Sequence, residues 1–385
     1  MEFDFAWVLL GLPLAFGLGW VASRLDIRQM RLENRRAPKA YFRGLNFLLN
    51  EQQDKAIDAF IEAVQNDPDT SELHFALGNL FRRRGEYERA VRVHEHLISR
   101  GDLSAQDRDR AQHALALDFL KAGLLDRAEA ALVKLEGTAF EDQARLALLT
   151  NCERTRNWAG AAEIAKKLAL SGQGNFDIRL AHYLCEQALA LQAKGDAVAA
   201  QSLLEQAVAT ADQALRPRLA LAQLLSQQGK STAAYEVLGH AIEKSPTGLP
   251  LIAPQFAKVA IAAQQIEPAK QVLEANYRKQ ASLDVLDAIV ALDSTDATKA
   301  AAVGDWYVHH LERQPSLVAA AKWIAGEKFE HEQFHSQVQR ALDHAVKPLS
   351  RYRCAACGFG ANQHFWQCPG CQAWDSYPAH RVEEL

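Results

Sequence analysis

The chain has 385 residues, enough for more than one structural unit. Hydrophobic residues make up 49% of the chain and charged residues 23%, which excludes a disordered chain. Six cysteines are too few for disulfides to be the main support of a chain of this length. The net charge of −4 gives no basis for a nucleic-acid partner. Frequent Ala, Leu and Gln, with few clusters of β-branched residues, predict an almost wholly helical protein.

An uncharged run stands near the N-terminus, from Phe5 to Ala22. As a helix it would be about 27 Å long, just enough to cross a bilayer. A cleaved signal peptide is the alternative, but signal peptides begin with a basic segment, whereas Glu2 and Asp4 precede this run. We therefore predict an uncleaved transmembrane anchor at residues 1–23.

A basic segment follows the predicted anchor. Residues 24–43 carry seven basic and two acidic side chains, a local net charge of +5. Positive charge holds its side of a membrane helix in the cytoplasm, so we expect a periplasmic N-terminus, a basic cytoplasmic linker at 24–39 and a cytoplasmic remainder. The small residues Gly11, Gly17 and Gly19 can bring two membrane helices together, which makes a homodimer one candidate assembly.

Small residues then recur at a fixed interval. Gly44 and Ala56 are followed by Gly78 and Ala90, at the same offset in both cases. This interval and pattern resemble the tetratricopeptide repeat, in which small residues stand where two antiparallel helices touch. A generic helical bundle has no reason to repeat these residues at one spacing. We predict an all-α superhelical solenoid of such repeats over residues 40–250, with two or three degenerate helix pairs over residues 251–347.

A solenoid of this kind offers a binding face built from the first helix of each pair. In the second repeat we expect that face to carry Phe75, Asn79, Arg82 and Arg83. Such residues could hold an extended peptide or a partner's terminus by charge-assisted hydrogen bonds. The alternative for each of them is an ordinary solvated helix face.

One catalytic pattern occurs, at His331-Glu332-Gln333-Phe334-His335. On a helix its two histidines could share a zinc ion, with Glu332 as the general base. A hydrolase needs a third ligand and an open coordination position, and the nearby His344 has no recognised spacing. Since 13 histidines make a chance match easy, we predict that the protein is not an enzyme.

Four of the six cysteines lie close to the C-terminus as two Cys-x-x-Cys pairs separated by a short loop. Four thiolates in this pattern suit one tetrahedral zinc or iron ion, whereas a pair of disulfides is the alternative. A reducing cytoplasm would keep the thiolates available for the metal. We predict a metal domain at residues 348–385, with these ligands: Cys354, Cys357, Cys368 and Cys371.

The order of anchor, basic segment, repeats and metal tail is distinctive. Together with the stretches Asn46–Ala56, Leu77–Arg82 and Tyr352–Phe359, it resembles the lipopolysaccharide assembly protein B family of Gram-negative bacteria along essentially the whole chain. The tail of that family is rubredoxin-like. The present tail departs from true rubredoxins in its short loop between the pairs, and in having Gln372 where a glycine normally follows the second pair.

The resemblance implies an inner-membrane regulator of lipopolysaccharide synthesis. It would act as an adaptor that promotes degradation of the deacetylase committing precursors to lipid A, together with a membrane-bound ATP-dependent zinc protease. Components of lipopolysaccharide export are further implied partners. An iron–thiolate redox or sensor protein using the C-terminal site is the alternative function. For the adaptor, we expect each Cys-x-x-Cys pair to form a turn, called a knuckle here, and the metal tail to hold the end of the solenoid in place. Five aromatic residues should pack around the knuckles and against the repeat helices: Tyr352, Phe359, Phe365, Trp366 and Trp374.

Overall fold

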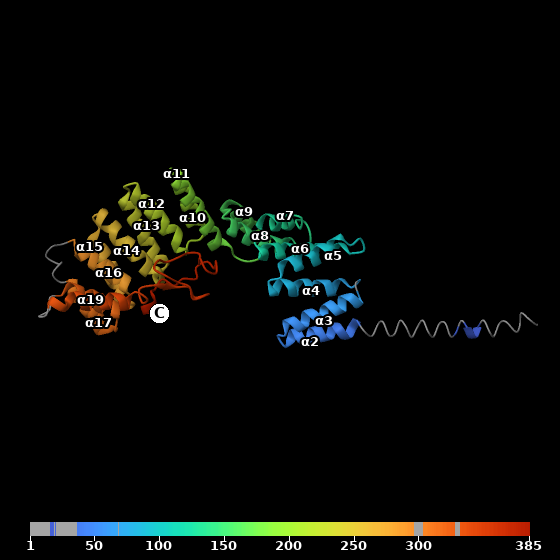
Figure 1. Cartoon of the computed structure of the whole chain (residues 1–385). Coiled ribbons are helices and arrows are strands. Elements are labelled where there is room, and N and C mark those ends of the chain that lie inside the picture. The colour runs from blue at the N-terminus through green and yellow to red at the C-terminus, as the bar shows by residue number, and fades with distance from the viewer. Residues whose placement is uncertain (1–15, 19, 21–36, 68, 296–302, 328–331) are drawn as a thin grey trace, which may run out of the picture. The chain divides into compact units, whose positions relative to one another are not determined.

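The structure, a computed structural model, describes residues 16–18, 20, 37–67, 69–295, 303–327 and 332–385. The chain divides into two compact units, Met1–Asn157 and Trp158–Leu385, which are described separately here (Figure 1). Almost all of the predicted anchor and linker lies outside the described residues. Within the described residues, no helix is both long and apolar enough to cross a membrane.

The first unit consists of antiparallel helices, each in contact with the next along the chain. The first helices of the successive repeats begin at positions 37, 71, 105 and 141. The first two intervals equal the repeat read from the sequence, and the third is two residues longer. The helices of this unit are α2 (Ala37–Leu49), α3 (Gln53–Asn66), α4 (Ser71–Arg84), α5 (Tyr87–Ser99), α6 (Ala105–Ala122), α7 (Leu125–Val133) and α8 (Glu141–Thr155).

Small residues sit at the helix crossings, as predicted. Ala56 and Ala90 are fully buried. A Cβ atom on Gly44 would lie 2.8 Å from the Phe60 ring, and one on Gly78 would lie 2.5 Å from His94 Nε2. Both glycines are therefore required by the close approach of the two helices in a pair.

A buried polar network joins the second repeat to the third. His94 on α5 replaces the aromatic residue of the first repeat, and its Nδ1 lies 2.5 Å from Asp118 Oδ2 on α6. Asp118 also accepts a bond of 2.8 Å from Arg82 on α4. Because Asp118 is fully buried, it needs both partners, and together they fix the relative position of three helices.

The second unit continues the pattern through a larger core. From position 215 onward the first helix of each pair begins at 215, 249, 283 and 317, the same interval as between the first two repeats. The interval therefore continues into the stretch where the sequence fits the repeat pattern poorly. The helices of this unit are α9 (Trp158–Leu170), α10 (Asp177–Ala193), α11 (Ala197–Thr210), α12 (Leu215–Gln227), α13 (Ser231–Lys244), α14 (Leu249–Ala262), α15 (Ile266–Lys279), α16 (Leu283–Asp293), α17 (Val303–Arg313), α18 (Leu317–Gly326) and α19 (Glu332–Val346).

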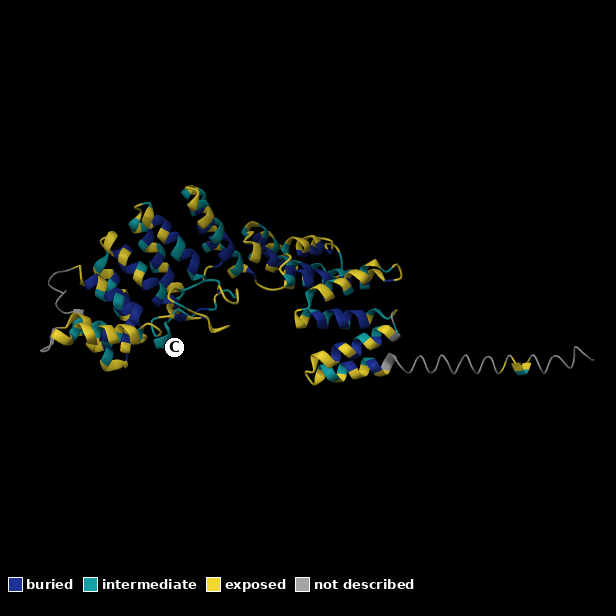
Figure 2. Ribbon diagram, in the orientation of Figure 1, coloured by how far each residue is buried: buried dark blue, intermediate teal, exposed yellow. Residues whose placement is uncertain are grey.

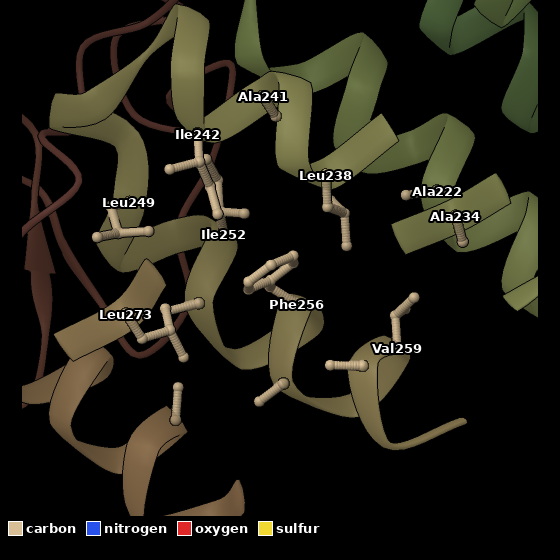
Figure 3. Packing of buried hydrophobic residues seen from close by; sticks show 14 of the residues in the cluster. Ala222, Ala234, Leu238, Ala241, Ile242, Leu249, Ile252, Phe256, Val259 and Leu273 are labelled. Carbon is tan, nitrogen blue, oxygen red and sulfur yellow. The ribbon is translucent and has the colours of Figure 1, made fainter. Parts of the chain in front are cut away.

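The core of this unit is a continuous row of apolar side chains between helix layers. Leu238 of α13 and Phe256 of α14 lie at its centre, next to Leu273 of α15 (Figure 3). Degenerate helix pairs were predicted for residues 251–347. The described residues of this stretch belong to three helix pairs, from α14 to α19. In both units the buried sides of the helices face their neighbours (Figure 2).

The C-terminal segment is built differently, from short strands and turns. Strand β1 (Tyr352–Arg353) pairs antiparallel with β2 (Gly360–Ala361), and a single bridge joins Gln367 to Trp374. A 3-10 helix, η3 (Val382–Glu384), ends the chain, and a similar turn, η1 (Pro246–Gly248), precedes α14. This segment lies against helices of the second unit (Figure 1).

The close contact at Gly78 gives a first prediction. Gly78→Ala should destabilise the first unit by about 1–3 kcal/mol, because the added methyl group forces His94 away from Asp118. Thermal unfolding followed by circular dichroism measures the loss. Gly101→Ala is the matched control, since its Cβ would meet no atom within 4 Å. Equal stability of Gly78→Ala and the wild type would contradict this description of the crossing.

Candidate metal centre

The two Cys-x-x-Cys pairs form two similar turns that face each other. In the first turn the Gly358 amide donates to the Cys354 carbonyl over 2.9 Å, and in the second the Gln372 amide donates to the Cys368 carbonyl over 2.8 Å. The β1–β2 pair flanks the first turn, and the Gln367–Trp374 bridge flanks the second. Each turn therefore holds its two sulfur atoms at the tip of a short hairpin.

The four sulfur atoms form a compact group. The Sγ atoms of Cys354 and Cys371 are 3.8 Å apart, those of Cys357 and Cys368 are 3.7 Å apart, and all four lie within 4.8 Å of one another. Four sulfurs placed about 2.3 Å from one metal ion at tetrahedral angles would be about 3.8 Å apart. None of the four is in a disulfide. The residues fit one tetrahedral metal ion, and their sulfur ligands suit iron or zinc.

Hydrogen bonds to two of the sulfurs, those of Cys354 and Cys368, favour the charged ligands that a metal needs. The Ser376 hydroxyl, 3.2 Å from Cys354 Sγ, and the amides of Cys357 and Ala356 lower the pKa of Cys354 to about 6. Burial opposes ionisation of Cys368, yet the amides of Cys371 and Gly370 lower its pKa. Hydrogen bonds from these backbone amides stabilise the thiolate form of the cysteines, which is the form that binds a metal ion.

One residue in the second turn is strained. Gly358 follows the first pair with φ +78°, and Gln372 stands at the equivalent position of the second pair with φ +62°. A left-handed conformation is easy for glycine and unfavourable for glutamine. Gln372 in place of a glycine therefore preserves the turn but lowers the stability of the tail.

Aromatic residues surround the knuckles in part as predicted. Tyr352 and Tyr377 are buried, and the Tyr377 hydroxyl lies 3.9 Å from Cys368 Sγ and donates to the Phe359 carbonyl over 3.2 Å. Phe365 packs against this group, whereas the Phe359 ring is exposed. Tyr377, which places its hydroxyl next to a sulfur, was not among the predicted aromatics.

The second knuckle docks on α10 and α12 of the repeats. His182 of α10 stacks on Trp374 with ring centroids 4.7 Å apart, and its Nε2 lies 2.8 Å from Asp375 Oδ2. The Arg216 guanidinium of α12 lies over the Trp374 ring at 5.9 Å. Trp374 therefore belongs to the interface between the tail and the solenoid as much as to the knuckle.

The end of the chain docks on α16. Arg381 makes a two-pronged ion pair with the buried Asp284, through bonds of 2.7 Å from Nη2 and 2.9 Å from Nε. This pairing raises the pKa of Arg381. The Glu384 carboxylate accepts the amide of Leu283, the first residue of α16.

Its neighbour Glu383 docks on α18 in the same manner. The Glu383 carboxylate accepts the amides of Leu317 and Val318 over 2.7 Å and 3.2 Å. Unpaired amides at a helix N-terminus attract an anion, so Glu383 and Glu384 each cap one helix of the solenoid. Sequence reasoning missed this set, because the only signal was a charged C-terminus.

The predicted groove of the first unit is partly wrong. Phe75 is only 1% exposed and lies under the Arg110 guanidinium, so it is a core residue and lines no surface. Arg82 donates to Asn79 Oδ1 over 2.5 Å as well as to Asp118, which ties both predicted groove residues into the fold. Arg83 is exposed, and its role in binding stays a prediction.

The H-E-x-x-H pattern falls partly outside the described residues, which omit His331. His335 contacts the carbonyl of Ile324 over 2.9 Å, at the end of the neighbouring helix. Among the described residues, only the four tail cysteines form a group of three or more side chains that could hold a metal ion.

The strain at Gln372 gives a second prediction. Gln372→Gly should stabilise the tail by about 1 kcal/mol, because glycine adopts the left-handed conformation freely. The measurement is the chelator concentration that removes half of the bound metal, which should rise. Gln363→Gly is the control, since Gln363 is exposed and has an ordinary negative φ, and it should bring no gain. A lower midpoint for Gln372→Gly would refute the strain.

Two family profiles agree with the two parts of the structure. Residues 352–377 match the family profile described as "Rubredoxin metal binding domain", and residues 73–109 match "Tetratricopeptide repeat". A solved structure described as "Structure of Naa15/Naa10 bound to HypK-THB" is 14% identical with a TM-score of 0.42, covering 82% of this chain and 48% of that one.

Curated relatives match over nearly their whole length. "Lipopolysaccharide assembly protein B" of Escherichia coli (strain K12) is 31% identical over 95% of each chain. The protein of the same name from Haemophilus influenzae is 28% identical over 95% of this chain and 96% of its own. The chain therefore belongs to the lipopolysaccharide assembly protein B family.

Proposed function

We propose that the protein is a membrane-tethered cytoplasmic adaptor that regulates lipopolysaccharide synthesis. It would bring the deacetylase that commits precursors to lipid A to a membrane-bound ATP-dependent zinc protease, and contact with export components is part of the same proposal. The support is the family, whose members are named for lipopolysaccharide assembly, and the uncharged run at 5–22 followed by a segment of net charge +5. These features favour a single-pass inner-membrane protein with its N-terminus in the periplasm.

The observation that carries the adaptor proposal is the docked metal tail. Its four sulfurs would supply all four ligands of a tetrahedral ion, with no open position of the kind that catalytic metal sites keep. The same tail binds the N-termini of α16 and α18 and the side of α10. A closed metal site that ties one end of a repeat protein together suits a scaffold better than an enzyme.

The binding surface we propose lies on the first helices of the first unit. Arg83, Lys121 and Arg154 occupy the same position, the last but one residue of α4, α6 and α8, and all three are exposed. In the second unit the corresponding helices are in contact with the tail. An extended segment with acidic side chains would complement the row of cations.

A redox or sensor role is the alternative, and one observation favours it. Cys357 and Cys371 are exposed residues, one in each knuckle, so the four-cysteine site lies at the protein surface. An iron ion held there would be accessible to small oxidants or to an electron-transfer partner. Reversible reduction of a coloured, iron-loaded protein, with loss of regulation after zinc replaces iron, would support this role over the adaptor.

The adaptor proposal predicts that regulation needs both the metal and the docking. Cys354→Ser with Cys357→Ser should abolish metal binding, whereas Asp284→Ala should keep the metal and release the C-terminus by removing the partner of Arg381. Both variants should lengthen the half-life of the deacetylase in the host, measured after synthesis is stopped.

The control is Glu163→Ala, which removes only an exposed ion pair with Lys166. It should leave the half-life of the deacetylase unchanged. Normal degradation in the double cysteine variant would show that the metal tail is dispensable. If the deacetylase is degraded normally in Asp284→Ala but not in the double cysteine variant, regulation needs the metal but does not need the docking of the last residues.

A further inference from the structure

The first helix of the solenoid, α2, exposes an apolar stripe. Phe42 is 64% exposed and Leu49 is 82% exposed, and the half-buried Leu45 stands between them at helical spacing. The opposite side of α2 packs against α3, with Ala40 and Gly44 buried. Along its length α2 carries exposed as well as buried residues (Figure 2).

Charge on α2 is of one sign. The helix contains no Asp or Glu, and its two charged side chains, Lys39 and Arg43, lie one turn apart and are exposed. Arg43 makes an ion pair of 3.0 Å with Glu62 of α3, in which both side chains are about half exposed. The charge that α2 itself places beside the apolar stripe is therefore positive, and Glu62 of α3 offsets part of it.

This combination indicates one occupant, an anionic lipid surface. A helix that lies in the membrane interface has Phe and Leu on one side and Lys or Arg beside them. The centre of a protein–protein interface is depleted of charged side chains, whereas Lys39 and Arg43 both stand within one helical turn of Phe42. The sequence adds continuity, because residues 24–43 carry a net charge of +5 and follow the uncharged run at 5–22.

We propose that α2 binds the surface of the membrane, with Phe42 and Leu49 in the headgroup region and Lys39 and Arg43 on anionic lipid phosphates. The first repeat then rests on the bilayer, which restricts how far the rest of the repeats can reach from it. This inference rests on the proposed membrane anchor and adds a second, separate contact with lipid.

The test uses the full chain in nanodiscs of phosphatidylcholine, with or without phosphatidylglycerol. Hydrogen exchange of the amides of residues 39–49 should be about tenfold slower with phosphatidylglycerol. Phe42→Asp with Leu49→Asp should remove this difference. Leu170→Asp, at a leucine that is 89% exposed on α9, is the control and should keep it. Unchanged exchange in α4 and α5 shows that the variants are folded.

The outcomes separate the two proposals. If the chain does not enter nanodiscs, the anchor is wrong and this inference falls with it. If the chain enters but α2 exchanges equally fast with both lipids, the anchor stands and α2 does not bind anionic lipid. If protection persists in the double aspartate variant, or depends on protein concentration, a protein segment or a second copy covers α2 and the inference is overturned.

Discussion

The ion pair between Arg381 and Asp284 is the contact that holds the end of the chain on the second unit. Asp284 lies in the first turn of α16 and is almost fully buried, so its charge needs a partner that only the far end of the chain supplies. Removing one member of such a pair leaves an uncompensated charge, which costs about 3–5 kcal/mol when both are fully buried and less here, where Arg381 is partly exposed. The pair thus binds the last residues of the chain to the solenoid.

The metal knuckles explain how a short tail can act as a clamp. A segment of this size buries too little surface to fold alone, so a metal ion must supply much of its stability. Once folded, the tail presents Trp374 and Asp375 to α10 at one end, and Arg381, Glu383 and Glu384 to α16 and α18 at the other. Because the tail contacts α10, α12, α16 and α18, loss of the metal should destabilise helices well beyond the tail.

Much of the fold could be predicted from the sequence, because close contacts between neighbouring helices impose local rules. Gly44 and Gly78 are spaced by the repeat, and the four cysteines are spaced by the geometry of two knuckles. The docking contacts follow no such spacing. His182 meets Asp375 across 193 residues, and neither residue belongs to a pattern. Phe75 was misplaced for a related reason: helical position gives the direction of a side chain, whereas burial depends on Arg110 of the next repeat.

The most direct test of the clamp is hydrogen exchange of the whole protein before and after the metal is removed by a chelator. Metal removal should speed exchange in the first turns of α16 and α18, which Glu384 and Glu383 cap, and should leave α4 to α6 unchanged. If exchange becomes faster only in residues 352–377, and α16 and α18 stay as protected as before, the clamp is contradicted. The metal would then stabilise the tail alone.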